Sequence, residues 1–441
     1  MGRNKYHFIE VYMINVNDYK GNTDSEIFEA AMADLGSDGI LVIPPRECAN
    51  EPERDYWLID RAILIPENTT VILQNATIKL SDKCRDNFFR SANCGIGIEF
   101  PEKIKNVHIK GEGLCTLVGA DHPRATGDGS KVISNPCPYL DEDICKYAHW
   151  IDDDRRSPEK LTFADRHGYS YGTDAGKEGE SQRGDWRGIG ILFANVENFS
   201  IENLTIKESH GWGISVEACA YGRIEKIIFD ARMSKMIDGM LHNMENEDGV
   251  DIRNGCHHIT ISDISGQTGD DIVALTAIVP NTFNYKPGGS LCTTHVMHND
   301  YTKRDRDIYD IIIRNVVGYS QLCHNVRLLA CNTKIYNVVI DGIVDTSPEG
   351  HVHSTAITIG DYDAAYGSNK EDGVTNVTIS NVICKSRNAI RILGYLKDSC
   401  ISNVINRNPD CPVILSVRPN GLVNVKMSNL VSAGDVLVKE A

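Results

Sequence analysis

The stretch NEDGVDIRNGCHHITISDISGQTGDDIVAL, residues 246–275, decides the fold of this chain. It contains two short apolar runs, and each follows a pair of carboxylates: Glu247 and Asp248 precede the first run, Asp270 and Asp271 the second. The second pair lies 23 residues after the first (271 − 248 = 23). If both runs are strands and the interval is one coil of a solenoid, the carboxylates stack one rung apart, about 4.8 Å along its axis.

Carboxylates that lie this close together change one another's pKa values. They cannot all ionise with ordinary pKa values, so one of them is pushed toward the protonated form that a general acid needs. Turn formation is the competing explanation, because Asp-Gly and Gly-Asp pairs are also common in turns. A single pair favours a turn. Two pairs in register, each before an apolar run, favour a catalytic site.

From Gly188 onward the sequence repeats one phrase of alternating apolar and polar residues, as in NVTISNV at 376–382. Its central residues recur at intervals as small as 22 (401 − 379 = 22). A repeat of short strands with this period predicts a β-solenoid, in which each coil buries its inward side chains against its neighbours. We therefore predict an all-β fold, a single right-handed parallel β-helix spanning 1–441. The central residues are Ile201, Ile224, Ile261, Ile313, Ile340, Ile379, Ile401 and Met427.

A second phrase recurs between these repeats and aligns side chains in columns. The inward apolar column is Val250, Val273, Val326, Ile357 and Ile390. Two residues before it lie Asp248, Asp271, His324, Thr355 and Asn388. One residue after it, facing outward by strand alternation, lie Asp251, Ala274, Arg327, Thr358 and Arg391. The columns predict a compact patch of carboxylates, a histidine and two arginines on one side of the solenoid.

One amphipathic helix is predicted near the N-terminus, within 20–36. Thr23 and Glu26 have capping-box spacing, and Gly36 supplies a C-terminal stop. The helix is expected to cover the open end of the solenoid, whose edge groups would otherwise be unpaired. The residues expected on its buried face are Ile27, Ala30, Ala31 and Leu35.

The polar, glycine-containing segment at 120–187 is too long for an ordinary connection. It predicts an insertion, and both a lid over the site and a disordered loop are compatible with its composition.

The amino-acid composition limits the classes of partner that the protein is expected to bind. The chain has 441 residues and a net charge of −16, which argues against nucleic acid because phosphates require a basic surface. No apolar run approaches the roughly 18 residues of a membrane span, so no membrane partner is expected. The fourteen cysteines include no C-x-x-C pair, and the first residues lack the apolar core of a secretory signal. We therefore expect buried thiols and a cytoplasmic protein, in which a homo-oligomer is compatible with the sequence.

No metal or cofactor is expected either, because the chain contains no H-E-x-x-H pattern and no phosphate loop of the G-x-x-x-x-G-K type.

Three segments resemble motifs of the polygalacturonase-type glycoside hydrolases (glycoside hydrolase family 28), which belong to the pectate-lyase-like β-helix superfamily. NEDGVD at 246–251 resembles Asn-Thr-Asp-Gly-x-Asp, and GDD at 269–271 resembles the Asp-Asp motif. CHN at 323–325 resembles the Gly-His-Gly segment with both glycines replaced. The family's Arg-Ile-Lys motif would fall at 358–360, where this chain has Thr358, Ile359 and Gly360.

The resemblance implies hydrolysis of a glycosidic bond with inversion. Asp270 would be the general acid, Asp248 and Asp271 would activate the water, and His324 would tune the proton affinity of the acid. The residues expected to bind substrate are Arg327, Arg391, Glu247 and Asp251. The expected substrate is an oligosaccharide, uronate-containing as in pectin, cleaved from its end.

Two other functions remain open from the sequence. A polysaccharide lyase on the same fold would use the aspartates to bind calcium and Arg327 or Arg391 as the base. A non-catalytic glycan-binding solenoid would use the acidic pairs as turns.

Overall fold

The computed structural model describes residues 12–36, 38–47, 51–84, 86–95, 98, 100–121, 186–209, 211–237, 240–243, 247–278, 296, 305–361 and 369–440. The predicted insertion at 120–187 lies almost entirely outside these residues, as does Asn246.

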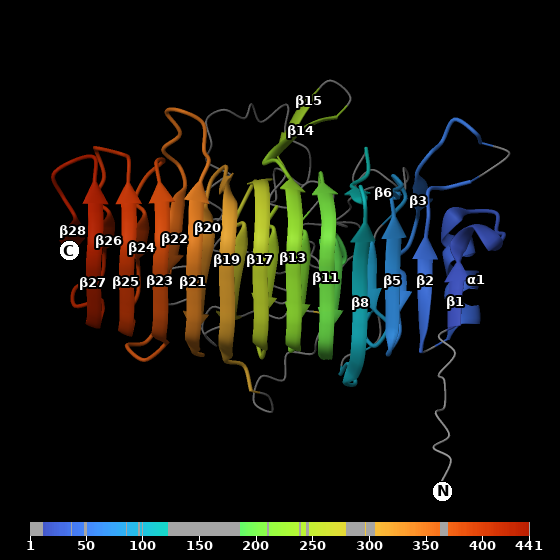
Figure 1. Ribbon diagram of the computed structural model, residues 1–441, viewed down its shortest axis with the longest axis horizontal. Coiled ribbons are helices and arrows are strands. Elements are labelled where there is room, and N and C mark those ends of the chain that lie inside the picture. Colours follow the sequence, from blue (N-terminus) through green and yellow to red (C-terminus); the bar gives the residue numbers. More distant parts are fainter. Residues whose placement is uncertain are drawn as a thin grey trace, which may run out of the picture.

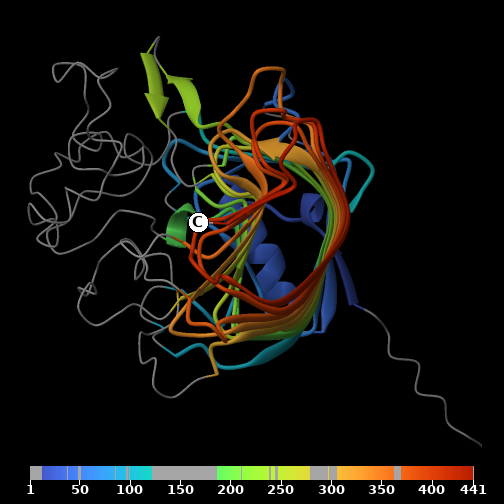
Figure 2. The ribbon, with the colours of Figure 1, turned by 90° about the vertical axis from the view of Figure 1, so that its left-hand side faces the viewer.

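The chain winds into a single parallel β-helix whose coils follow one another along the long axis (Figure 1). Two sheets form its walls, and the strands in both pair in parallel. Seen along the axis, the coils superimpose and enclose the core (Figure 2). The predicted right-handed parallel β-helix is confirmed.

The larger wall, sheet A, has 15 strands. Its main path is β1 (Tyr12–Asn15), β2 (Gly39–Ile43), β5 (Thr69–Gln74), β8 (Ile104–Glu112), β11 (Val196–Lys207), β13 (Ala220–Asp230), β17 (His257–Thr268), β19 (Ile308–Ser320), β21 (Ile335–Asp345), β23 (Val374–Cys384), β25 (Leu396–Asn406) and β27 (Leu422–Ser432). Three shorter strands join it: β3 (Trp57–Ile59), β6 (Thr77–Leu80) and β9 (Thr116–Val118).

The second wall, sheet B, has 11 short strands. They are β4 (Ile63–Ile65), β7 (Phe89–Ser91), β10 (Ile191–Ala194), β12 (Ile214–Glu217), β16 (Val250–Arg253), β18 (Val273–Ile278), β20 (His324–Cys331), β22 (Thr355–Ile359), β24 (Ile390–Ile392), β26 (Ile414–Ser416) and β28 (Val438–Glu440). Outside both sheets, β14 (Ser234–Ile237) pairs antiparallel with β15 (Met240–Asn243), and two short 3-10 turns occur at Val16–Asp18 and Trp186–Gly188.

The long strands of sheet A bend where the repeated phrase carries Asn or Asp. In β23, Asn376 and Asn381 have φ of 54° and 57°, a left-handed conformation that Asn tolerates better than most residues. Their side chains also bond from rung to rung: Asn381 Nδ2 donates to Asp341 Oδ1 at 2.7 Å, and Asn403 Nδ2 donates to Asn381 Oδ1 at 3.2 Å. The repeated asparagines therefore make the corners of the coil.

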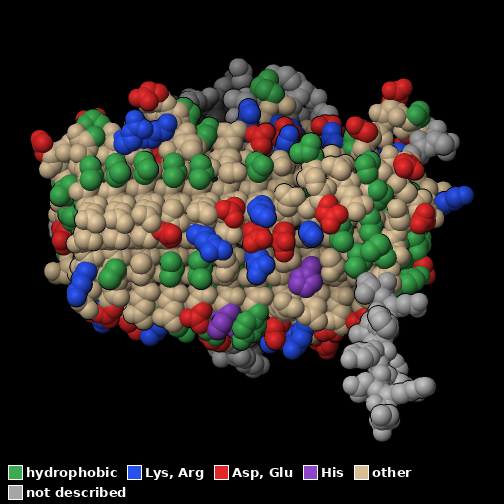
Figure 3. Space-filling view, in the orientation of Figure 1, with side chains coloured by type: hydrophobic (Ala, Val, Ile, Leu, Met, Phe, Trp, Pro, Cys, Tyr) green, Lys and Arg blue, Asp and Glu red, His purple; other side chains and the backbone are tan. Residues whose placement is uncertain are grey.

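The predicted inward columns form the core. Ile313, Ile340 and Ile379 pair on consecutive rungs, and each is fully buried. Burial of each such side chain contributes roughly 1.5–3 kcal/mol. Stacking also aligns the outward positions of sheet A, so that hydrophobic side chains form rows across its strands (Figure 3). Among the described residues, no helix is long and apolar enough to span a membrane.

The predicted cap is α1 (Asp24–Leu35), which lies beside β1 at the N-terminal end of the solenoid (Figure 1). The Thr23 side chain accepts from the backbone N–H of Glu26 at 3.2 Å, and Glu26 Oε2 accepts from the N–H of Asn22 at 2.7 Å. The expected buried face was wrong in part: Ala30 is exposed, and Phe28 is buried in its place. The larger Phe28 ring gains more from burial, and it packs edge-on against Trp57 at 5.1 Å.

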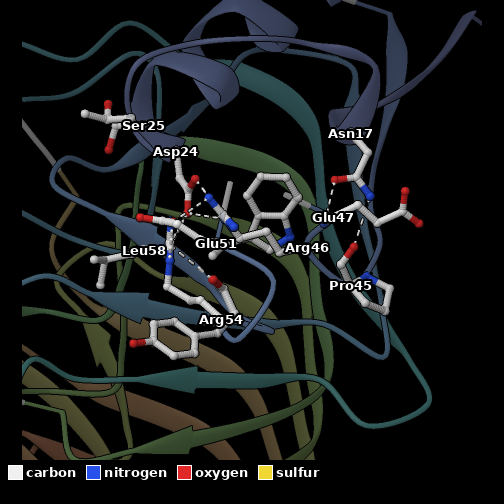
Figure 4. Close-up of polar contacts among 12 residues, drawn as sticks. Asn17, Asp24, Ser25, Pro45, Arg46, Glu47, Glu51, Arg54 and Leu58 are labelled. Atoms are coloured by element: carbon white, nitrogen blue, oxygen red, sulfur yellow. Dashed lines mark hydrogen bonds and ion pairs between the residues drawn. The ribbon is translucent and has the colours of Figure 1, made fainter. Parts of the chain in front are cut away.

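Asp24, the first residue of α1, connects the cap to the first coils (Figure 4). Its buried carboxylate accepts from Arg46 Nε at 3.0 Å, from Arg54 at 2.6 Å and from the backbone N–H of Leu58 at 2.7 Å. Two positive charges and one strand N–H thus share a single carboxylate.

Candidate active site

The register of sheet B places the predicted column side by side. Val250 pairs with Val273 and Val273 pairs with Val326, so Asp248, Asp271 and His324 lie on consecutive rungs. Backbone hydrogen bonds hold this order: the N–H of Gly249 donates to the carbonyl of Asp271 at 2.8 Å, and the N–H of Ile272 donates to the carbonyl of His324 at 2.9 Å. Asp248 therefore lies one rung from Asp271, as the 23-residue interval between them predicts.

Three carboxylates converge at this point. Asp248, Asp270 and Asp271 each offer a carboxylate oxygen, and these atoms all lie within 4.8 Å of one another. The backbone N–H of Asp271 donates to Asp270 Oδ1 at 2.9 Å, which orients the Asp270 side chain. On the other side, His324 Nδ1 lies 2.6 Å from Asp271 Oδ1. The histidine therefore bonds to one carboxylate of the group and lies near a second, that of Asp270.

Burial and mutual repulsion control the protonation of these groups. Burial, followed by the charges of Asp251, Asp270 and Asp271, raises the pKa of Asp248 well above its ordinary value. Burial also raises the pKa of Asp251 strongly, against the lowering effect of Arg253. The pKa of Asp270 is raised by burial and then by Asp271. The group therefore keeps a proton at a pH where isolated aspartates have lost theirs.

Arg327 is the predicted cation that reaches the carboxylates. Its Nη1 lies 3.8 Å from Asp271 Oδ2, and its Nη2 lies 2.9 Å from Asp361 Oδ2. Asp361 was not predicted as a site residue. It follows the end of β22, two residues beyond the aligned phrase, so extending the alignment past Ile359 would have found it.

Two other predicted binding residues, Asp251 and Arg391, lie at different distances from the carboxylates. Asp251 lies in the outward column opposite Ala274, close enough for Asp270 and Asp271 to raise its pKa. Arg391 shares that column with Arg327 but lies two rungs away, about 10 Å along the axis.

Glu247 lies beside a different set of charges. Its side chain is buried, its pKa is raised well above the ordinary value by burial, and the charges that act on it are those of Lys235, Glu208 and Asp230. The structure therefore does not bring Glu247 into the group formed by Asp248, Asp270 and Asp271.

Trp212 is a site neighbour that sequence reasoning missed. Ile214 pairs with Val250, so Trp212 occupies the column of Asp248 one rung toward the N-terminus. The Arg253 guanidinium lies over its ring at 4.4 Å. Continuing the column one coil backward from Asp248 would have identified this residue.

Cys323, one of the residues that replaces a motif glycine, also contacts the acidic group. Its thiol donates a hydrogen bond to the Asp270 carboxylate, which lowers the pKa of Asp270 against the effect of burial. Together with Asp271 and His324 it forms a second set of possible ligand atoms that lie within 4.8 Å of one another.

Known proteins share the fold and part of the sequence pattern. The family model for glycosyl hydrolases family 28 matches residues 163–287, which contain both aspartate motifs. No curated protein matches the chain. The resemblance to polygalacturonase-type proteins inferred from the motifs is confirmed.

Three solved structures illustrate the likeness. A family 28 exopolygalacturonase from Yersinia enterocolitica is 11% identical, with a TM-score of 0.50, over 98% of this chain and 77% of its own. The polygalacturonase from Erwinia carotovora is 14% identical, with a TM-score of 0.53, over 97% of this chain and 96% of its own. A tailspike protein of E. coli bacteriophage HK620, in complex with a pentasaccharide, is 12% identical, with a TM-score of 0.53, over 93% of this chain and 66% of its own. At this identity the likeness concerns the fold.

Proposed function

We propose that the protein is a glycoside hydrolase that cleaves a uronate-containing oligosaccharide, with Asp270 as the general acid. The convergence of Asp248, Asp270 and Asp271 within 4.8 Å carries this proposal. Hydrolysis of a glycosidic bond needs one carboxyl group that is protonated and one that is ionised. Buried, mutually repelling carboxylates supply both forms at one pH.

We assign the roles from the match to the family's aspartate motifs. Asp270 gives its proton to the leaving glycosidic oxygen, while water attacks the anomeric carbon and loses its proton to Asp248 or Asp271. The hydrogen bond from the Asp271 N–H holds Asp270 in place, and His324 fixes the Asp271 carboxylate at 2.6 Å. Exchange with solvent then restores the proton on Asp270.

Inversion is the stereochemical outcome we propose, on the match to the family's aspartate motifs. Inverting enzymes typically separate acid and base by about 6.5–9.5 Å, and retaining enzymes by about 5–5.5 Å. The carboxylate oxygens of Asp248, Asp270 and Asp271 lie closer together than those of a typical inverting pair. The anomeric configuration of the product therefore tests whether the reaction inverts or retains. A water that bonds to Asp248 and Asp271 at about 2.8 Å each can bridge oxygens up to about 5.6 Å apart, so the group accommodates an attacking water. Proton NMR of the first product anomer decides between the two outcomes.

Substrate would lie along the axis across sheet B. Arg327, on the C-terminal side of the carboxylates, is placed to bind a sugar carboxylate in exchange for its contact with Asp361. Trp212, on the N-terminal side, offers an aromatic ring for packing against a sugar. Asp251 can accept from sugar hydroxyls, and the predicted binding role of Arg391, two rungs away, would require a longer substrate. Glu247 has no part in this proposal, because its side chain is buried beside Lys235, Glu208 and Asp230.

A panel of defined oligosaccharides incubated with the purified protein tests the proposal. The expected result is new reducing ends from uronate-containing substrates, and none from the Asp270→Asn variant. Cleavage that is absent on every glycan, or retained in the variant, would contradict it.

A polysaccharide lyase is the second candidate. Its supporting observation is that Asp248, Asp270 and Asp271 could together hold a cation, with Arg327 3.8 Å from Asp271 as a possible base. Lyase action leaves an unsaturated product that absorbs ultraviolet light, and calcium-dependent absorbance growth during the same incubation would favour it.

We also propose a reducing, cytoplasmic location. Support comes from buried cysteines that form no disulfide, among them Cys94, Cys115, Cys219 and Cys256. Fractionation of the native cells with antibody detection tests this location.

A further inference from the structure

A mixed set of sulfur, nitrogen and oxygen ligand atoms lies at the C-terminal side of the carboxylate group. Asp271 precedes β18, and Cys323 and His324 lie one rung away at the start of β20. One ligand atom from each of the three residues lies within 4.8 Å of the other two. We propose that these three residues bind a zinc-type divalent cation.

The donor set suits such an ion. Zn²⁺ takes thiolate, imidazole and carboxylate ligands at about 2.0–2.3 Å, commonly with three protein ligands and one open position. Backbone pairing already fixes two of the three ligands relative to each other, because the N–H of Ile272 donates to the carbonyl of His324 at 2.9 Å.

Local charge also favours a cation. Asp248 and Asp251 are 6% and 1% exposed, and Asp248 Oδ1 and Asp251 Oδ2 have no hydrogen-bond partner among the described residues. Asp270 and Asp271 add two further carboxyl groups, whereas two cations act on the group: Arg327 lies against Asp271, and Arg253 lowers the pKa of Asp251. A bound divalent ion would offset this excess of buried carboxylate.

Cys323 binds the ion as its thiolate, so the Sγ–H proton leaves to solvent when the metal–sulfur bond forms. Burial and the charges of Asp270 and Asp271 raise the pKa of the Cys323 thiol well above its ordinary value. A divalent cation on Asp271 cancels part of that carboxylate charge and stabilises the thiolate.

The thiol distinguishes this site from a calcium site. Asp248, Asp270 and Asp271 by themselves offer oxygen ligands, which suit Ca²⁺ and Mg²⁺. Thiolate and imidazole instead select Zn²⁺ and similar ions. Because the motif that 323–325 resembles has glycine at the position of Cys323, the sulfur ligand is a property of this chain.

Metal binding has a consequence for hydrolysis, and this consequence rests on the proposed function. The ion would occupy the Asp271 carboxylate and the His324 imidazole, which the hydrolytic reaction needs. Zinc is therefore expected to inhibit the enzyme reversibly, and a chelator is expected to restore its activity.

The binding test uses the full chain, stripped of metal and free of substrate. Zn²⁺ is titrated against a chromophoric chelator, and Co²⁺ is added in parallel because thiolate ligation gives it a charge-transfer band in the near ultraviolet. The wild type should bind one Zn²⁺ that excess Ca²⁺ does not displace, and it should show the cobalt band. Cys323→Ser should lose the band and weaken zinc binding by about tenfold or more.

Cys400→Ser is the matched control, since Cys400 is exposed on β25 and belongs to neither ligand group of the described residues. It should keep both the band and the zinc affinity. If Cys323→Ser does not fold, as judged by thermal melting, Cys323→Gly and His324→Gln replace it. Equal zinc binding by the wild type and the folded variants would overturn the proposal, as would displacement of zinc by calcium.

The inhibition test is separate. If no glycan is cleaved, the proposed function fails while zinc binding stands; if glycans are cleaved but zinc binds independently of Cys323, the metal site fails while the hydrolase stands.

Discussion

Asp271 links the two parts of the candidate site. Its backbone N–H orients Asp270, one carboxylate oxygen lies 2.6 Å from His324 Nδ1, and the other lies 3.8 Å from Arg327 Nη1. A change at Asp271 should therefore affect several steps together, whereas changes at Asp270 and Asp248 can separate their roles.

Asp270→Asn removes the proposed proton donor and keeps the side-chain shape. Turnover should fall by about 10²–10⁴-fold, the range that general acid catalysis supplies. Asn Oδ1 can still accept from the Asp271 N–H, so the melting temperature should change little. Steady-state kinetics and thermal melts measure the two effects. A variant that keeps its turnover, or one that does not fold, would count against the role.

Asp248→Asn should make the protein more stable at neutral pH. Burial raises the folded-state pKa of Asp248 above its unfolded value of about 3.9, so the unfolded state loses this proton first as pH rises. Wild-type stability therefore falls from about pH 4 up to the folded-state pKa and then levels off. Each unit of pKa difference amounts to about 1.4 kcal/mol, and the variant avoids this cost.

Chemical denaturation of both proteins between pH 4 and 8 measures this effect. The stability difference should be smallest near pH 4 and should grow as the pH rises toward 7. Asp435→Asn, at an exposed position, controls for the loss of one negative charge. An Asp248→Asn protein that is less stable than the wild type at pH 7 would contradict the electrostatic interpretation.

Arg327 and Arg391 offer a comparison between two arginines of one column. Arg327→Gln should lower kcat/KM on a uronate substrate by the roughly 1.5–3 kcal/mol of a charged hydrogen bond, about 10–150-fold. Arg391→Gln should have a smaller effect on a short substrate, because it lies two rungs farther from the carboxylates. Kinetics on a uronate and its neutral analogue check this. Equal or better turnover of the neutral glycan by the wild type would show that the substrate is not anionic.

At the scale of the element, short strands position the site and long strands support it. Asp271 and Cys323 lie just outside β18 and β20, where the backbone leaves the sheet and two successive acidic side chains fit. Opposite them, sheet A bends at left-handed Asn and Asp residues of the repeated phrase. The repeated phrase keeps its register from rung to rung although the loops between the strands differ in length, and this register stacks the carboxylates.

The cap helix allows a test of element stability. Asp24→Ala leaves Arg46 and Arg54 without their shared buried carboxylate and should cost about 3–5 kcal/mol, the scale for breaking a buried ion pair. Glu29→Ala, on the same helix, breaks the exposed pair with Arg61 and should cost about 0–1 kcal/mol. Urea denaturation compares them. Similar losses for the two variants would mean that Asp24 does not anchor the cap.

At the scale of the molecule, the solenoid offers a long surface along which a polymer could bind. We propose, from the length of the segment at 120–187 in the sequence, that one end of this surface is blocked and that cleavage proceeds from the chain end. Digestion of a polyuronate should then release reducing sugar steadily while viscosity falls slowly. A rapid fall in viscosity with little reducing sugar would indicate internal cleavage.

Much of this architecture follows from the sequence by itself. The repeat around Ile313, Ile340 and Ile379 predicts the solenoid because a coil of short strands buries its inward residues only by stacking. The 23-residue interval between Asp248 and Asp271 predicts their adjacent rungs for the same reason. Thr23 and Glu26 predict the start of the helix because capping is a local interaction.

Tertiary structure decided what depends on side-chain direction and on contacts between coils. Glu247 and Asp248 are neighbours in sequence, yet Asp248 joins Asp270 and Asp271, whereas the Glu247 side chain lies beside the charges of Lys235, Glu208 and Asp230. The contacts of Cys323 with Asp270, of Arg327 with Asp361 and of Arg253 with Trp212 join segments whose loops differ in length. A repeat period specifies which rungs are adjacent, whereas the rotamers and loop paths that bring these side chains into contact are set only by packing in the folded protein.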